Sequence, residues 1–248
     1  MSELAYMTLS DWGQQGTAME AQSARIREWL GAAPYLFAVA SMKDYQDRHN
    51  SLDRTVIDHI VPEAPDRTVV SIQQLRELIR DDTEITHPIT VLRPFDESDC
   101  DLIAELVGAG RLQKVLVIVH HASYPIRVWL DGMGAVNLHT GASIPAPDPV
   151  LLEAAKLIQN EDYNGLSSGH GKDAIVALVR AFAAKGYPVE PEPWVQAYFA
   201  LGGSFRHAAS ISKLVAEMKR GVRHRVKPRY RDEIFTILSE RVAAAVSS

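Results

Sequence analysis

The segment GASIPAPDPV, residues 141–150, divides the chain into two parts with different patterns. It carries three prolines in five residues after Gly-Ala-Ser, and such a segment forms a semi-rigid, extended connector. Before it, short apolar runs alternate with amphipathic segments, whereas after it the apolar residues have helical spacing. The sequence therefore predicts an α/β domain over 1–140, a proline-rich connector over 141–149 and an all-α domain over 150–248.

The part before the connector alternates between strand and helix patterns. Strands are expected in PYLFAVAS, RTVVSI, ITHPITVLRP and KVLVIVHH. Helices are expected in TAMEAQSARIREWL, SLDRTVIDHIV, SIQQLRELIR, ESDCDLIAELVGAG and YPIRVWLDGMG. Within the first of these helices, Thr17 and Glu20 have the spacing of a capping box. Strands that alternate with helices form parallel β-α-β units, so the predicted fold class is a three-layer α/β domain with a parallel sheet.

The part after the connector is predicted to be helical almost throughout. Helices are expected in PVLLEAAKLIQ, KDAIVALVRAFAAKG, PEPWVQAYFAL, SFRHAASISKLVAEMKRG and RDEIFTILSERVAAAV. The segment VRHRVKPRY, residues 222–230, lacks this spacing and is expected to be extended.

Composition limits the cellular setting. No apolar run approaches the roughly 18 residues of a membrane-spanning helix, and the N-terminus lacks the basic and apolar regions of a secretory signal. The single Cys100 excludes an internal disulfide and suits a reducing compartment. We therefore expect a cytoplasmic protein with no membrane partner.

The formal net charge of −5 conceals a difference between the two parts. Before Pro145, 12 Lys and Arg stand against 20 Asp and Glu, which gives −8; from Pro145 onward, 14 stand against 11, which gives +3. Such a division suggests that the two parts have different partners, or that they bind each other.

Residues 164–182, NGLSSGHGKDAIVALVRAF, look at first like a phosphate-binding loop. A Walker A loop needs G-x-x-x-x-G-K-[ST] between a strand and a helix. Here Leu166 occupies the first glycine position, Asp173 occupies the magnesium-binding Ser or Thr position, and the preceding segment has helical spacing. We therefore predict a plain turn between two helices. The alternative is an anion bound at the helix N-terminus beside His170 and Lys172.

Polar side chains follow three of the predicted strands, at the edge where open parallel sheets bind ligands. Asp44 follows the first of these strands, Asp96 the next and His120 the last. If these strand ends adjoin, the three residues could provide acid–base catalysis or hold a divalent metal ion. The structural alternative is that Asp96 caps a helix and that His120 is an ordinary hydrogen-bonded residue. HExxH, CxxC, GxSxG and GxGxxG patterns are absent, so the only cofactor considered is that metal ion.

The stretch KRGVRHRVKPRYR, residues 219–231, holds seven Lys and Arg and no acid. Five cations occupy alternate positions, which share one face of an extended chain: Arg223, Arg225, Lys227, Arg229 and Arg231. The opposite face carries Val222, Val226, Pro228 and Tyr230, which are expected to hold the segment on the helical domain. Four further cations complete the candidate nucleic-acid-binding set: Arg206, Lys213, Lys219 and Arg220.

Three interpretations of this basic segment stay open. It binds nucleic-acid phosphates, or it is solvated or docks on the acidic first part, or it binds an acidic protein or a phosphorylated small molecule. The preferred function is a cytoplasmic nucleic-acid-associated protein whose helical part grips phosphates while the α/β part makes a second contact. The alternatives are an enzyme acting on a phosphorylated or nucleotide substrate at the strand ends, and a protein-binding subunit of a larger assembly.

Overall fold

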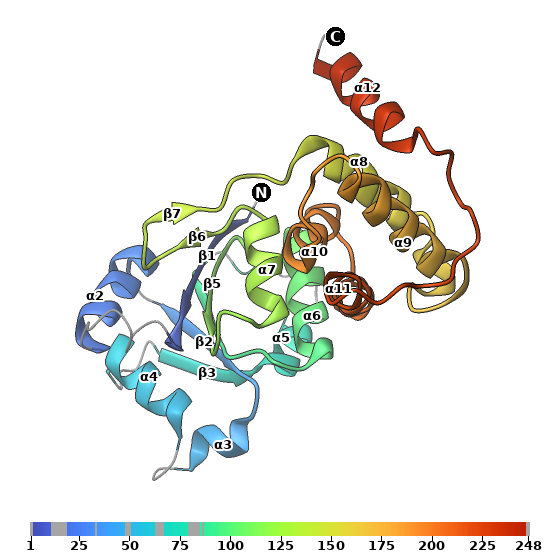
Figure 1. Ribbon diagram of the computed structural model, residues 1–248. Helices are drawn as coiled ribbons and strands as arrows, with labels where there is room; N and C mark the ends of the chain where they lie inside the picture. Colours follow the sequence, from blue (N-terminus) through green and yellow to red (C-terminus); the bar gives the residue numbers. More distant parts are fainter. Residues whose placement is uncertain are drawn as a thin grey trace. The chain divides into compact units, whose positions relative to one another are not determined.

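A mixed, mostly parallel sheet lies at the centre of the first part of the chain (Figure 1). In this computed structural model, residues 2–10, 19–32, 34–47, 51–62, 67–78, 85 and 87–246 are described. The chain divides into two units, Met1–Ile144 and Pro145–Ser248. That these units are independently folding domains, joined by a connector over 141–149, stays a prediction.

Within the described residues of the first unit, the strand order is β3-β2-β4-β5-β1-β6-β7. The strands are β1 (Glu3–Thr8), β2 (Tyr35–Val39), β3 (Arg67–Ser71), β4 (Ile89–Leu92), β5 (Lys114–Val119), β6 (Val136–Asn137) and β7 (Ala142–Ser143). All neighbours pair in parallel except β6 and β7. The α/β class is confirmed, and β2, β3, β4 and β5 lie in the segments predicted for them. The sequence analysis missed β1 and the β6–β7 hairpin.

Helices cover both faces of this sheet (Figure 1). On one face, α2 (Met19–Leu30) and α4 (Leu52–Ile60) pack their buried isoleucines against Phe37, Val39 and Leu116. On the other face lie α5 (Ile72–Leu78), α6 (Glu97–Gly108) and α7 (Pro125–Gly132). The short helix α3 (Met42–Gln46), which was not predicted, follows β2.

The central strand β1 is fixed to α7 by a buried polar contact. The Tyr6 hydroxyl donates a hydrogen bond of 2.7 Å to Asp131 Oδ1, and Arg127 forms an ion pair with the same carboxylate. Burial and the hydrogen bond to Asp131 raise the pKa of Tyr6 well above its ordinary value. Because each polar atom has a partner, these groups are buried without a large desolvation penalty.

Two predicted helix starts illustrate how local sequence sets the helix ends. Ser71 and Gln74 form a reciprocal capping box, in which each side chain accepts a hydrogen bond from the backbone N–H of the other residue. Pro125 occupies the first turn of α7, as predicted. The capping box predicted for Thr17 and Glu20 includes a residue outside the described ranges.

The second unit consists of helices, as predicted. They are α8 (Pro149–Gln159), α9 (Gly169–Ala183), α10 (Pro191–Ala200), α11 (Phe205–Lys219) and α12 (Ile234–Val246), with the one-turn 3₁₀ helix η1 (Asp162–Asn164) after α8. Phe182 joins three of these elements, because its ring contacts Trp194 and Phe235 edge to face. Among the described residues, no helix has the length and apolar character needed to cross a membrane.

Candidate nucleic-acid interface

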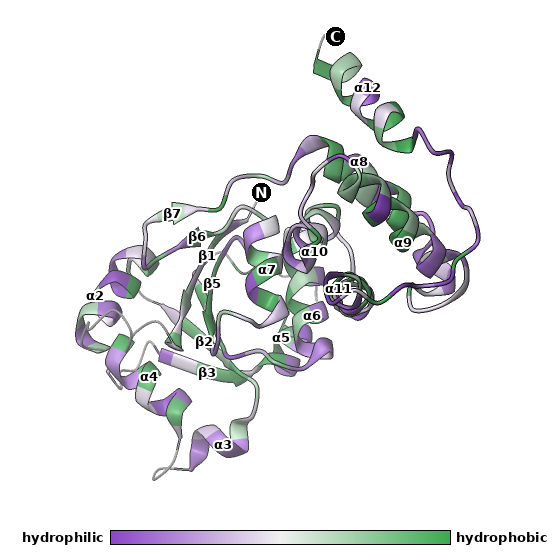
Figure 2. Cartoon of the chain, in the orientation of Figure 1, coloured by the Kyte–Doolittle hydropathy of each residue, from purple (hydrophilic) through white to green (hydrophobic). Residues whose placement is uncertain are grey.

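Residues 219–231, called here the basic arm, begin at the end of α11 and continue as an extended segment toward α12. Figure 2 shows that most of the segment between these helices is hydrophilic. All five alternating cations are exposed, whereas His224, Val226 and Tyr230 between them are half-buried. The prediction that Val222 lies on the inner face is wrong, because Val222 is 47% exposed; Pro228 is exposed as well, although it lies beside α9.

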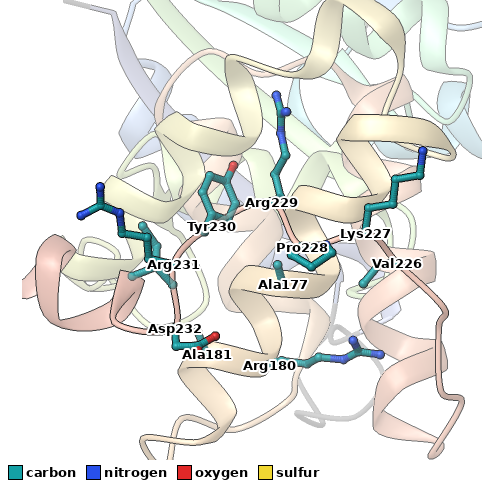
Figure 3. A pocket seen from close by; sticks show the side chains of 11 residues that line it. Ala177, Arg180, Ala181, Val226, Lys227, Pro228, Arg229, Tyr230, Arg231 and Asp232 are labelled. Carbon is teal, nitrogen blue, oxygen red and sulfur yellow. The ribbon is translucent and has the colours of Figure 1, made fainter.

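The inner side of the basic arm lies along α9. Arg180 Nη2 donates a hydrogen bond of 2.6 Å to the His224 carbonyl. Figure 3 shows Pro228 next to Ala177 of α9. A hollow of about 350 Å³ lies between the arm and α9. The alternation in the sequence is therefore realised only in part: Val226 and Tyr230 are half-buried, whereas Arg229 turns back to the helical unit.

A second attachment joins the basic arm to the segment after α8. The Arg229 guanidinium donates a hydrogen bond to the Glu161 carboxylate, whose side chain is only 11% exposed. Burial, together with the negative charge of Glu161, raises the pKa of the neighbouring Tyr230 to about 12. These attachments lie inside the helical unit, whereas the intramolecular hypothesis had placed the arm's partners in the acidic first part.

Two contacts fix the start of the basic arm. Lys219 Nζ lies 2.6 Å from Glu190 Oε2 as an exposed ion pair. The His224 side chain is 8% exposed, and its Nε2 atom lies 3.4 Å from Glu217 Oε2. The path of the arm is thus set from both of its ends.

Most of the arm's cations have no carboxylate partner. Lys219 and Arg229 form ion pairs, but within the part of the chain that the structure describes no ion pair is found for Arg220, Arg223, Arg225, Lys227 or Arg231. Phosphates that approach these five residues would not have to displace an internal carboxylate. This leaves a row of available positive charge on an attached segment.

Arg206 and Lys213, the two candidates on α11, are exposed. The opposite side of this helix buries Phe205, Ile211 and Val215. The turn between α10 and α11 is tight, because a Cβ atom on Gly203 would lie 2.1 Å from the ring of the fully buried Tyr198. Tyr198 also donates a hydrogen bond of 2.9 Å to Asp162 Oδ2, which ties this turn to η1.

The glycine-rich segment before α9 follows η1 and a loop, not a strand, which agrees with the rejected Walker A hypothesis. The helix begins at Gly169, earlier than predicted, so Asp173 lies beyond its first turn. Gly171 is required by packing, because a Cβ there would lie 2.4 Å from the Gly165 carbonyl oxygen. His170 is exposed and Lys172 is half-buried. An anion site at these two residues stays a prediction.

The three strand-end candidates of the first unit follow neighbouring strands, because β2, β4 and β5 are adjacent in the sheet. Asp44 is exposed in α3, and its backbone N–H donates to Ser41 Oγ. Asp96 stands at the N-cap position of α6 without a side-chain cap bond, which corrects the structural alternative proposed for it. The His120 ring packs against Tyr124, with the two centroids 5.9 Å apart.

These strand ends do not form a recognisable metal site. Among the described residues, no three His, Cys, Asp or Glu side chains gather as possible ligands, so Asp44, Asp96 and His120 do not form such a group. A different contact organises this edge: Arg93, with φ of 48°, places its Nε atom 2.6 Å from Oδ1 of the buried Asp53. The sequence analysis did not find Asp53, because it lies in the first turn of α4, far from β4 in sequence.

Two residues of the helical unit were also missed: Glu161, which attaches the basic arm, and Tyr163, which is 78% exposed in η1. Both lie in the segment NEDYNG, whose composition indicates only a turn. No signal in the sequence links this segment to residues 229 and 230.

Comparison of the chain with protein-family models, with curated proteins and with solved structures gives no match. The functional argument therefore depends on the geometry and charge of the residues themselves.

Proposed function

We propose that this protein binds nucleic acid and that the basic arm of the helical unit contacts the phosphate backbone. The observation that carries the proposal is a set of exposed cations without ion pairs among the described residues, at alternate positions of an attached, extended segment: Arg223, Arg225, Lys227 and Arg231. Arg206 and Lys213 on α11 add positive charge to the same unit. The proposal has three further parts: the α/β unit makes a second contact with the nucleic acid, the two units are separate domains, and the protein is cytoplasmic.

The attachments of the basic arm favour binding. A segment that already has a defined path loses less conformational entropy when a ligand engages it. Alternate residues of an extended chain repeat every ~6.6 Å, since each residue adds about 3.3 Å. Each phosphate contact releases condensed counterions, so unpaired cations such as Arg223, Arg225 and Lys227 would contribute directly to affinity.

The test is fluorescence anisotropy with labelled single-stranded and duplex DNA and RNA at several salt concentrations. Replacing Arg223, Arg225 and Lys227 by Gln should weaken binding to all sequences alike. The slope of log K against log salt concentration should also become shallower by about 2 to 3 units if all three residues contact phosphates. The matched control replaces Lys156, Lys185 and Arg241, exposed cations outside the arm, and should retain the parent's slope.

Two outcomes would contradict the proposal. A parent protein that binds none of these polymers at low salt removes the nucleic-acid function. The variant with Arg223, Arg225 and Lys227 replaced by Gln is called the arm variant. If it and the control variant lose affinity for nucleic acid equally, net charge and not the basic arm determines binding.

A further inference from the structure

Tyr163 is the most exposed aromatic residue in the described part of the chain, at 78%. It lies in the middle of η1, and neither its ring nor its hydroxyl makes a ring contact or a hydrogen bond with any described residue. The face of an exposed aromatic ring can stack on a nucleic-acid base.

The fold brings this ring to the basic arm. Glu161, two residues before Tyr163, accepts the hydrogen bond from Arg229. That hydrogen bond raises the pKa of Arg229 above its ordinary value. Tyr163 lies in η1, directly after Glu161 and Asp162, and so belongs to the short segment to which the arm is attached.

An exposed ring beside a row of cations has a particular chemical use. In a duplex the faces of the bases are covered by their neighbours, whereas a single strand offers base faces that stack on aromatic side chains.

We propose that the helical unit binds single-stranded nucleic acid, with one base stacked on Tyr163 and the adjoining phosphates along the basic arm. This inference rests on the proposed nucleic-acid function and specifies the form of the ligand. The hydrogen bond between Arg229 and Glu161 holds the ring and the cations in one arrangement. A strand that engages the arm then brings a base to Tyr163 without further ordering of the protein.

The experiment compares parent, Tyr163→Ala and Tyr163→Phe in anisotropy titrations with a single-stranded probe and a duplex of the same sequence. The parent should bind the single strand more tightly. Tyr163→Ala should weaken single-strand binding by about 5- to 150-fold, the range expected for the loss of one stacked base. Duplex affinity and the salt slope should stay unchanged. Tyr163→Phe, which keeps the ring, should bind as the parent does.

Phe95→Ala is the control, since Phe95 is another exposed aromatic residue, at 64%, and should have no effect. Thermal unfolding should be the same for all variants, because Tyr163 makes no packing contribution. Tight binding of the parent protein to either single-stranded DNA or single-stranded RNA supports the inference.

The outcomes separate this inference from the proposed function. If Tyr163→Ala binds the single strand as the parent does, while the arm variant is weakened, stacking is refuted and phosphate binding stands. Stacking is also refuted if the parent binds single strand and duplex with equal affinity. It is refuted as well if Tyr163→Ala loses affinity for both ligands by the same factor. A parent that binds neither refutes both.

Discussion

The guanidinium of Arg229 is hydrogen-bonded to the carboxylate of Glu161, which precedes it by 68 residues in the chain. This contact explains how a segment without helix or sheet hydrogen bonds has a defined path. The carboxylate is nearly buried, so it has few alternative partners in solvent. Together with the bond from Arg180 to the His224 carbonyl, it holds the basic arm at two points.

Replacing Glu161 by Gln should loosen the basic arm without unfolding the helical unit. The substitution removes the charge that Arg229 faces, and a loosened extended segment is a good protease substrate. Trypsin cleavage after Arg223 and Arg225, which are not followed by proline, should become several-fold faster, as measured by mass spectrometry. Glu153→Gln is the matched control, since Glu153 forms its ion pair with Lys156 on α8, away from the arm. Unchanged cleavage in Glu161→Gln would mean that other contacts fix the arm.

Replacing Gly203 by Ala should destabilise the protein by about 1–3 kcal/mol, the usual cost of overpacking a core. The added Cβ would lie 2.1 Å from the Tyr198 ring, which is fully buried and cannot move aside easily. Urea unfolding followed by circular dichroism measures the change. Gly108→Ala, where nothing lies within 4 Å, is the control and should leave the unfolding midpoint nearly unchanged. A parent-like midpoint for Gly203→Ala would contradict the packing described for this turn.

Some of the eight tyrosines should stay protonated in the native protein above pH 10. Burial, as the largest cause, raises the pKa of Tyr6 and Tyr198 well above the ordinary value of about 10, and raises that of Tyr230 to about 12. Above pH 10 the unfolded chain therefore loses protons that the native state retains, and the free energy of unfolding should fall as the pH rises. Tyrosinate absorbance should increase at pH 10.5 when denaturant is added. Complete ionisation without denaturant would contradict the burial.

Cys100 should be unreactive while the protein is folded. The thiol is buried in α6, and burial together with the neighbouring Asp99 and Asp101 raises its pKa to about 12. At pH 8, labelling with a thiol-specific disulfide reagent should be slow in buffer and rapid in denaturant. Rapid labelling of the native protein would mean that α6 opens easily.

Elements with a regular apolar pattern, such as β5 and α11, could be predicted from the sequence, because their own residues specify the buried side. The strand β1 could not, since Tyr6 and Thr8 look polar until Asp131 and the sheet surround them. The alternation of charge in the basic arm correctly indicated an exposed face. Its attachment to Glu161 and its nearness to Tyr163 depend on tertiary contacts between distant segments, which no local pattern records.

The position of β1 in the sheet has a consequence for synthesis on the ribosome. Its residue Glu3 pairs with Lys114 of β5, so β1 must wait for a partner that emerges from the ribosome more than a hundred residues later. Until then both hydrogen-bonding edges of an apolar strand are open in the nascent chain, a state prone to wrong pairing. Such a long sequence separation also slows folding of the isolated protein. The first unit is therefore expected to fold late during translation and to depend on chaperones more than the helical unit does.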